Sequence, residues 1–203
     1  MKLIWHGHSC FTLESRQGTV VFDPYADGSV PGLPPLDLQA DLVLCSHDHQ
    51  DHNARDKVHL SGKAPSFTVE RLNTFHDPEG GALRGPNTIH VISADGLRVA
   101  HMGDLGCALT PEQLEKLQGL DAVLLPVGGY YTIDAAQAAQ AAQQLKARVV
   151  VPMHYRGPGF GYDVIAPLDG FLALCSDVVH YPGPVLTLDA GMPTQTAVLD
   201  RFG

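Results

Sequence analysis

The sequence predicts an α/β protein with a mixed β-sheet, and three observations lead to this fold class. Aliphatic or alternating runs of strand length recur along the chain, helical patterns lie between several of them, and Gly/Pro-rich loops interrupt the pattern. Interleaved strands and helices are typical of layered α/β folds. With 203 residues the chain is long enough for one sizeable core, so we expect a single domain over residues 1–203.

Nine segments are expected to form strands because aliphatic and β-branched residues dominate them. In chain order these strands are Lys2–Trp5, Ser9–Glu14, Thr19–Phe22, Leu42–Cys45, Thr88–Ser93, Leu97–His101, Ala122–Pro126, Val149–Val151 and Val185–Leu188. A further run, "FTVERLNTFH" at residues 67–76, also has the character of a strand.

Three segments are expected to be helical. Thr110–Leu117 opens with Thr-Pro-Glu-Gln, in which a hydroxyl cap precedes a proline at the first turn. Asp134–Ala147 is rich in alanine and glutamine, and its small side chains suit close packing on a sheet. Leu168–Leu174 is a weaker third pattern. The Gly/Pro-rich segments Asp27–Pro35 and Gly157–Gly161 are expected to be irregular loops.

The charge balance argues against a nucleic acid or a membrane surface as partner. The chain carries 22 acidic and 13 basic residues, for a formal charge of −9, and it has no Lys/Arg cluster. Its start, MKLIWHGHSCF, resembles neither a signal peptide nor a membrane span, and no apolar run of about 18 residues follows. The four cysteines form no CxxC pair, as expected for free thiols in a reducing cytoplasm. We therefore expect a cytoplasmic protein with a small-molecule substrate, and its oligomeric state stays open.

Four strand-like runs end in residues that bind metals. "LVLCSH" ends at His47, "FTVERLNTFH" at His76, "LRVAHMGD" at Asp104 and "VVVPMH" at His154. In open α/β sheets, functional sites gather at the carboxyl ends of the strands. These side chains are therefore expected to meet at one edge of the structure.

The segment "HDHQDH" at residues 47–52 adds further donors to this set. If the segment is extended, His47, His49 and Asp51 share a face, and His52 faces elsewhere unless the chain turns. This layout would split the donors into two sets a short distance apart. Imidazole suits zinc and similar ions, and carboxylates bind or bridge them. A solvated loop would explain the cluster alone, but not the matching residues at three other strand ends. The full set of donors is too large for one tetrahedral zinc ion and fits two ions that share a carboxylate.

These residues resemble the metallo-β-lactamase superfamily. Its His-x-His-x-Asp-His signature matches residues 47–52, and its upstream aspartate matches Asp23 in "VVFDP". Its later histidine, aspartate and histidine match His76 in "TFHD", Asp104 in "HMGDLG" and His154 in "VPMHY". The motifs "GHSCF", "FDP", "GDLG", "PVGG" and "VPMHY" are similar to those of a compact branch of metal-dependent hydrolases that includes ascorbate-6-phosphate lactonase-like proteins.

The resemblance implies an αββα sandwich of two mixed β-sheets flanked by helices, with a dinuclear metal site at one edge between the sheets. The implied ligands are His47, His49 and His76 for the first ion, Asp51, His52 and His154 for the second, and Asp104 as the bridge. Two divalent ions are expected as cofactors, with zinc first and manganese or iron as alternatives. His49 stands where the oxygen-reducing diiron relatives have glutamate, which argues against redox chemistry.

The expected activity is metal-dependent hydrolysis of a small ester, lactone or phosphoester. A hydroxide held between the ions would attack the carbonyl or phosphoryl centre, and Asp51 would orient it or relay its proton. Two alternatives stay open. One is a phosphodiesterase acting on nucleotides or phospholipid head groups, and the other is a metal-loaded binding or regulatory protein without turnover.

Several further residues are candidates for the surroundings of the site. Asp23 is expected to accept a hydrogen bond from a ligand histidine. His8 in "GHSC" is expected to line the pocket and His101 in "AHMGD" to face the interior near Asp104, with a satisfied buried histidine as the alternative for each. Tyr131, just before the helix at Asp134, is expected near an anionic group. The loop residues Arg84 and Arg156 are candidate contacts for a phosphate or carboxylate, or else ordinary surface arginines.

Overall fold

The N-terminal sheet supplies one layer of the structure. The computed structural model describes residues 1–201, and this sheet has five strands. In spatial order they are β13 (Val185–Thr187), β1 (Lys2–Gly7), β2 (Cys10–Ser15), β3 (Gly18–Phe22) and β5 (Leu42–Leu44). Neighbouring strands are antiparallel except for the parallel pair β3–β5, so the sheet is mixed.

The second layer is a larger sheet of seven strands. In spatial order they are β12 (Val178–Tyr181), β14 (Gln195–Leu199), β11 (Val149–Met153), β10 (Ala122–Pro126), β9 (Leu97–His101), β8 (Pro86–Ala94) and β7 (Thr68–Phe75). Strands β12 to β9 are parallel, and β8 is antiparallel to both of its neighbours. Strands β7, β9 and β11 therefore run in the same direction and end at the same edge.

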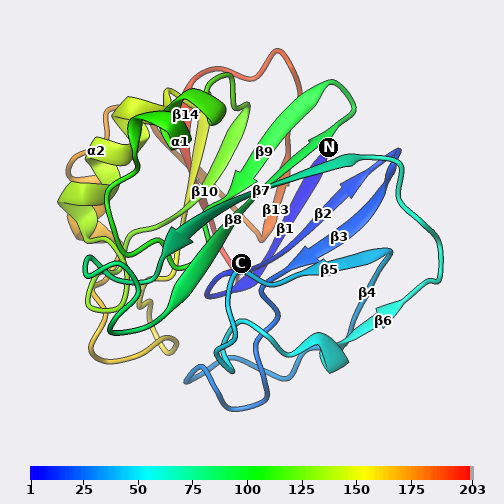
Figure 1. The fold of residues 1–203 in the computed structure, drawn as a ribbon, viewed down its shortest axis with the longest axis horizontal. Helices are drawn as coiled ribbons and strands as arrows, with labels where there is room; N and C mark the ends of the chain where they lie inside the picture. Colours follow the sequence, from blue (N-terminus) through cyan, green and yellow to red (C-terminus); the bar gives the residue numbers. More distant parts are fainter. Residues whose placement is uncertain (202–203) are drawn as a thin grey trace.

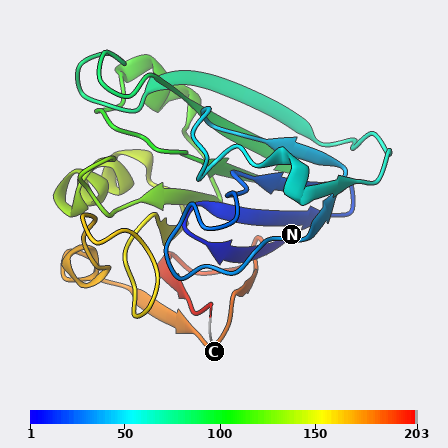
Figure 2. The same ribbon diagram turned by 90° about the horizontal axis from the view of Figure 1, so that it is seen from below.

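The two sheets lie face to face and enclose the hydrophobic core (Figures 1 and 2). Leu3 and Phe11 of the N-terminal sheet are fully buried in the same hydrophobic cluster as Ile89, Val99 and Val123 of the larger sheet. Burial of apolar side chains from both sheets is what holds the layers together, at roughly 1.5–3 kcal/mol for each large side chain. A small parallel pair joins β4 (Leu38–Ala40), which lies between β3 and β5, to β6 (Val58–Leu60). A 3-10 turn, η1 (Arg55–Lys57), directly precedes β6 in the connection from β5 to β7.

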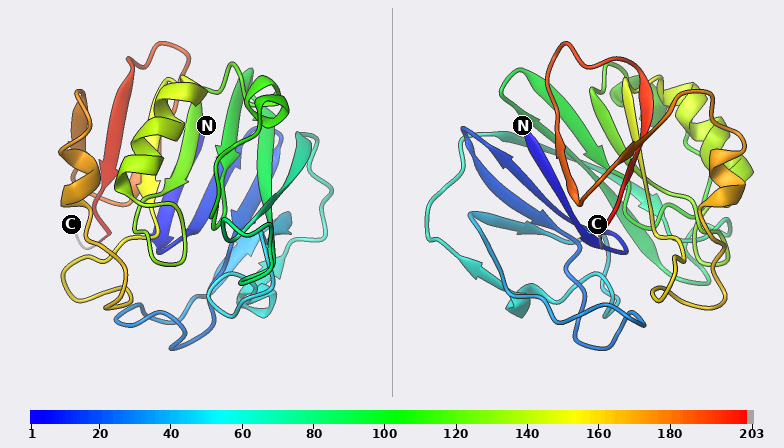
Figure 3. Two further views of the ribbon diagram at one scale, coloured as in Figure 1. Left: turned by 60° about the vertical axis from the view of Figure 1, so that its left-hand side comes forward. Right: turned by 180° about the vertical axis from the view of Figure 1, so that it is seen from behind.

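The helices are few and lie on the outer side of the larger sheet (Figure 3). They are α1 (Pro111–Lys116), α2 (Ala135–Leu145) and α3 (Asp169–Leu172). Helix α2 buries Ala138, Ala141 and Leu145, which form its sheet-facing side. Within residues 1–201 the longest helix has 11 residues, so no helix there has the length and apolarity that crossing a membrane requires.

The predicted fold class, two mixed sheets in a sandwich with helices, is confirmed. Each of the nine expected strands corresponds to an observed one, and β9 and β10 have the expected bounds. The three expected helices are present in shorter form. Thr110 and Asp134 lie outside α1 and α2 as their N-caps, and each closes a capping box with the glutamine three residues later. The helices are shorter than expected because capping residues and frayed ends do not count as helical turns.

Candidate metal centre

Four strands deliver the predicted donors to one edge between the sheets. His76 directly follows β7, and His154 directly follows β11. Asp104 lies three residues after β9, and His47 lies three residues after β5 of the other sheet. Because β7, β9 and β11 run in the same direction, their carboxyl ends meet at this edge.

The first donor group consists of His47, His49 and His76. One ring nitrogen of each lies within 4.8 Å of the others. The ring of His47 lies 4.6 Å from that of His49 and 4.6 Å from that of His76, centroid to centroid. His49 is exposed, whereas His47 and His76 have side chains that are only 3% exposed. Three imidazoles whose nitrogens lie this close together could hold one metal ion.

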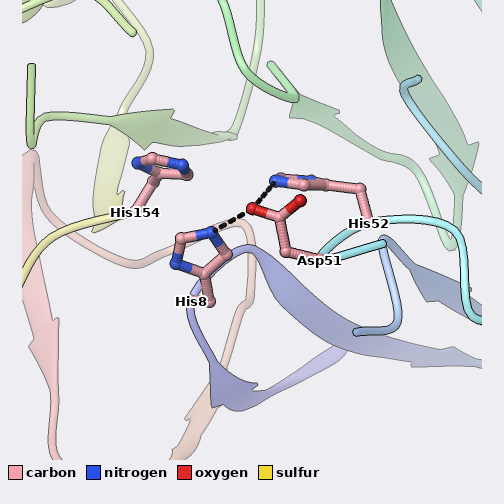
Figure 4. Close-up of side chains that lie close together, drawn as sticks. All are labelled: His8, Asp51, His52 and His154. Atoms are coloured by element: carbon pink, nitrogen blue, oxygen red, sulfur yellow. Dashed lines mark hydrogen bonds and ion pairs between the residues drawn. The ribbon is translucent and has the colours of Figure 1, made fainter. Parts of the chain in front are cut away.

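The second donor group consists of His8, Asp51, His52 and His154, and its donor atoms also lie within 4.8 Å of one another. Figure 4 shows the Asp51 carboxylate between the rings of His8 and His52. Asp51 Oδ2 lies 3.3 Å from Nε2 of His8 and 3.6 Å from Nε2 of His52. This group contains the three residues expected for the second ion and adds His8.

Asp104 joins the two groups. Its Oδ2 lies 3.3 Å from Nε2 of His76 in the first group. The same oxygen lies 3.1 Å from Nε2 of His154 and 3.2 Å from Nε2 of His52 in the second group. A carboxylate placed between two donor sets is the arrangement that a bridging ligand requires.

Several buried donor atoms at this edge have no hydrogen-bond partner. They are Oδ1 of Asp104 and Nε2 of His47, His52 and His154. The last two lie close to Asp104 Oδ2 but do not have hydrogen-bond geometry toward it. Leaving a buried polar atom unpaired costs about 1–3 kcal/mol, and more when it is charged. A cation bound between these atoms would accept their lone pairs and remove this cost. The residues present therefore fit bound metal ions.

The signature segment turns instead of running straight. The His52 backbone N–H donates to the His49 carbonyl at 2.9 Å, and residues 46–52 form bends and turns rather than a strand. The segment is therefore not extended, and the alternative that the chain turns before His52 is the one observed. The turn separates Asp51 from His47 and His49, and it places Asp51 beside His52, because local backbone hydrogen bonding overrides the alternation of an extended chain.

Asp23 fixes the orientation of His52, as expected for a residue behind a ligand. Its Oδ2 accepts a hydrogen bond from Nδ1 of His52 at 2.8 Å, which leaves Nε2 directed at Asp104. Ser46 contributes its backbone N–H at 2.7 Å and its hydroxyl at 2.6 Å to the two carboxylate oxygens. Burial would raise the pKa of Asp23, but the neighbouring imidazoles of His101 and His52 lower it below its usual value.

The carboxylates and imidazoles of the centre shift one another's pKa values. Burial would raise the pKa of Asp104, yet the imidazoles of His154 and His52 hold that pKa well below its ordinary value. Burial would lower the pKa of His52, but the Asp104 and Asp51 carboxylates raise it well above 6.5. These carboxylates therefore stabilise the protonated form of His52.

Metal uptake is expected to release a proton from His52 near neutral pH. A ligand histidine must be neutral at its metal-binding nitrogen, so the cation displaces the proton that the raised pKa retains. The apparent metal affinity should therefore rise with pH as long as the pH lies below the raised pKa of His52. Calorimetric titration of metal into metal-free protein, in buffers of different ionisation enthalpy, measures the released proton. Uptake without proton release, at an affinity that does not change with pH, would contradict this assignment.

His8 lies closer to the centre than a residue that only lines a pocket. It is 1% exposed and adopts a left-handed conformation with φ +51°, which for a residue other than glycine costs about 1–2 kcal/mol. Its carbonyl accepts hydrogen bonds from the Trp5 indole at 3.0 Å and from the His154 backbone N–H at 3.3 Å. These contacts offset the strain and direct the imidazole at Asp51.

His101 is a satisfied buried histidine, the alternative that the sequence left open. Its Nε2–H donates to the Ser9 carbonyl at 2.8 Å, and its Nδ1 accepts from the Gly103 N–H at 3.1 Å. The ring stacks on Phe22 at a centroid distance of 5.0 Å. His101 therefore lies behind the site, with Nδ1 3.9 Å from Asp23, and has no free nitrogen for a ligand.

The loop that carries Asp104 depends on two residues that the sequence reasoning did not single out. Asn87 on β8 accepts from the Asp104 backbone N–H at 3.0 Å and donates to the Met102 carbonyl at 2.9 Å. Gly106 lies so close to His76 that a Cβ there would be 2.2 Å from the His76 carbonyl carbon. The motif "GDLG" was the signal for this close approach, since a backbone-to-backbone contact requires glycine.

A cavity of about 270 Å³ opens onto the centre. Its lining consists of His49, Asp51, His76, Arg84, Asp104, Tyr131 and Tyr162. The predicted neighbours Arg84 and Tyr131 are thus part of it, whereas Arg156 lines other cavities and has Asp163 at 3.9 Å. Tyr162 was not anticipated. Its hydroxyl lies 3.3 Å from Asp51 Oδ2 and donates to the Ser29 carbonyl at 2.7 Å.

Two stacked mixed sheets with a His/Asp cluster at one edge define the class of metal-binding proteins with the metallo-β-lactamase fold. Residues 2–154 match the family model described as the β-lactamase superfamily domain. A UPF0173 metal-dependent hydrolase from Thermoplasma volcanium is 31% identical over 188 residues, which cover 76% of this chain and 83% of that protein. The chain belongs to the UPF0173 metal-dependent hydrolase family of the β-lactamase superfamily.

Solved structures agree with this placement. The crystal structure of a proposed Zn-dependent hydrolase of the superfamily from Thermotoga maritima superimposes with a TM-score of 0.76 at 32% identity, over 98% of this chain and 97% of that one. The metallo hydrolase Igni18 from Ignicoccus hospitalis has a TM-score of 0.61 at 24% identity, over 93% of this chain and 98% of that one. The second likeness supports the fold alone.

Proposed function

We propose that this chain hydrolyses a small ester, lactone or phosphoester in the cytoplasm and uses two divalent ions, with zinc first and manganese or iron as alternatives. The observation that carries the proposal is the position of Asp104 Oδ2. It lies 3.3 Å from Nε2 of His76 in the first donor group and 3.1 Å from Nε2 of His154 in the second. A site for one structural ion would not need two donor groups with a shared carboxylate.

The bound ions would supply Lewis acidity, which lowers the pKa of water toward neutrality and stabilises developing negative charge. The residues of this chain prepare that chemistry. Asp51 is held from two sides, since its Oδ2 lies 3.3 Å from Nε2 of His8 and 3.3 Å from the Tyr162 hydroxyl. A carboxylate fixed in this way at the cavity wall is placed to orient the attacking water and to accept its proton. Asp51 is therefore the proposed catalytic base.

The cavity favours small substrates. Its volume of about 270 Å³ lies below the roughly 300–1,000 Å³ of typical small-molecule sites. A phosphodiesterase acting on nucleotides or phospholipid head groups would have to leave much of its substrate outside this cavity. The resemblance to ascorbate-6-phosphate lactonase-like proteins supports lactones among the candidate substrates. A metal-loaded binding protein without turnover is the remaining alternative.

The proposal is tested by turnover that depends on metal. Metal-loaded protein is expected to hydrolyse at least one member of a panel of lactones, thioesters and phosphoesters. Chelation should remove the activity and added zinc or manganese should restore it, because hydrolysis in this proposal depends on the bound ions. Fully loaded, folded protein that is inactive across the panel would favour the binding alternative.

A further inference from the structure

Arg84 is the basic side chain at the mouth of the metal cavity. Among residues 1–201, the seven that line this cavity include no lysine and no second arginine. Arg84 is half-buried, so its guanidinium is neither free in solvent nor part of the core. It faces the same space as Asp51 and Asp104, whose carboxylates would repel an anion in the absence of bound cations.

The loop that carries Arg84 is anchored directly beside a metal ligand. Asp77 follows His76, is fully buried, and accepts four backbone N–H groups of this loop. The donors are Glu79 at 2.8 Å, Gly81 at 3.0 Å, Leu83 at 3.1 Å and Arg84 at 2.7 Å. The loop is closed again where the His76 N–H donates to the Gly85 carbonyl at 3.1 Å. Arg84 is therefore held at a fixed distance from His76 and the first donor group.

The guanidinium is positioned by an aromatic ring rather than by a carboxylate. Its central carbon lies 5.7 Å from the centroid of the Tyr131 ring, and Tyr131 in turn contacts the ring of Tyr162 at 5.9 Å. Within residues 1–201, no carboxylate lies within 4.0 Å of the Arg84 guanidinium. Stacking on an aromatic face holds a guanidinium in place without neutralising it or using its hydrogen-bond donors.

Three of the other arginines in this acidic chain pair with a carboxylate, as Arg84 does not. Arg16, Arg98 and Arg148 each have a carboxylate oxygen within hydrogen-bonding range, from Asp95, Glu70 and Asp121 respectively. With 22 acidic side chains and a formal charge of −9, partners are abundant. An arginine that is anchored, stacked and left without an acid beside a reaction cavity has its donors available for a ligand.

We propose that Arg84 binds an anionic substituent of the substrate, a carboxylate or a phosphate monoester, away from the bond that is cleaved. This assignment rests on the proposed hydrolase function and names its substrate class. The planar guanidinium can donate two parallel N–H hydrogen bonds to either oxyanion, and the Tyr131 ring holds the guanidinium in place. Hydrolysis itself is left to the metal centre, so Arg84 determines which ester is bound and not how it is cleaved.

The test compares Arg84→Met with wild type on three esters of matched size, one neutral, one with a carboxylate and one with a phosphate group. In the variant, KM for the anionic esters should rise about tenfold or more with little change in kcat, and KM for the neutral ester should not change. The two anionic arms show which oxyanion is preferred. Arg156→Gln is the matched control, since Arg156 lies outside this cavity, and should leave all three unchanged.

The outcomes separate this proposal from the hydrolase function. Equal KM in Arg84→Met and wild type for both anionic esters, with unchanged metal content and Tm, would overturn the role of Arg84 and leave the function intact. If the wild type turns over none of the esters, the role of Arg84 is tested by calorimetric titration of inorganic phosphate into metal-loaded wild type and metal-loaded Arg84→Met. About tenfold weaker phosphate binding in Arg84→Met would support the anion site, and equal Kd values would overturn it.

Discussion

Replacing Asp104 by alanine is expected to remove bound metal and to lower kcat/KM by at least about 1,000-fold, equal to about 4 kcal/mol of transition-state stabilisation. The reason is that one carboxylate oxygen serves both donor groups, lying 3.3 Å from Nε2 of His76 and 3.1 Å from Nε2 of His154. Without it, buried imidazoles face one another with no anion between them. Elemental analysis and steady-state kinetics on the same preparation measure both effects.

The matched control is Asp37→Ala, because the Asp37 side chain is 85% exposed and pairs with the exposed His59. It should keep the metal content and activity of the wild type. Thermal unfolding of Asp104→Ala shows whether the variant remains folded, and a folded variant lacking metal is the expected state. A folded Asp104→Ala protein with full metal content and full activity would show that Asp104 does not bridge the two groups.

Replacing Asp23 by alanine is expected to weaken metal binding or activity by about 10–100-fold, the usual effect of removing a carboxylate behind a ligand histidine. Asp23 accepts the Nδ1–H of His52 at 2.8 Å and so directs Nε2 toward Asp104. Its loss also leaves the buried Ser46 N–H without an acceptor, at a cost of about 1–3 kcal/mol in the free energy of unfolding.

Asp23→Asn serves as the comparison, since an amide oxygen still accepts one hydrogen bond but carries no charge. We expect metal affinity and stability in the order wild type, Asp23→Asn, Asp23→Ala. Calorimetric titration of metal and denaturant unfolding measure the two quantities separately. Metal affinity in Asp23→Ala equal to that of the wild type would contradict the orienting role of Asp23.

The fold was largely predictable because most of its strands are rich in aliphatic and β-branched residues. Val149–Val151 and Ala122–Pro126 are buried parallel strands, and such strands appear in sequence as continuous aliphatic runs. Two strands that were not predicted, β12 and β14, lack such a continuous aliphatic run. β12 (Val178–Tyr181) has no fully buried residue, and β14 (Gln195–Leu199) begins with polar residues that only its neighbours bury. Their strand state depends on pairing, β14 with β11 and β12 with β14, and a local pattern does not contain this information.

The donors of the metal centre were predictable because each follows a strand, and this rule also applies to His8 after β1. The backbone conformation was not predictable. The left-handed φ of His8 accompanies a contact with His154, which is 146 positions away in the sequence, and the turn at residues 46–52 is held by the hydrogen bond from His52 to His49. Tyr162 reaches Asp51 from 111 positions away, through a loop whose path no local signal specifies.

The number of ions per chain tests the central claim most directly. Protein purified without chelator, saturated with zinc and freed of excess metal, should contain two ions per chain by elemental analysis. His49→Ala in the first donor group and His154→Ala in the second should each retain about one. Folded wild-type protein that binds no zinc, or a single ion that both variants retain fully, would contradict a shared two-ion centre at this edge of the sheets.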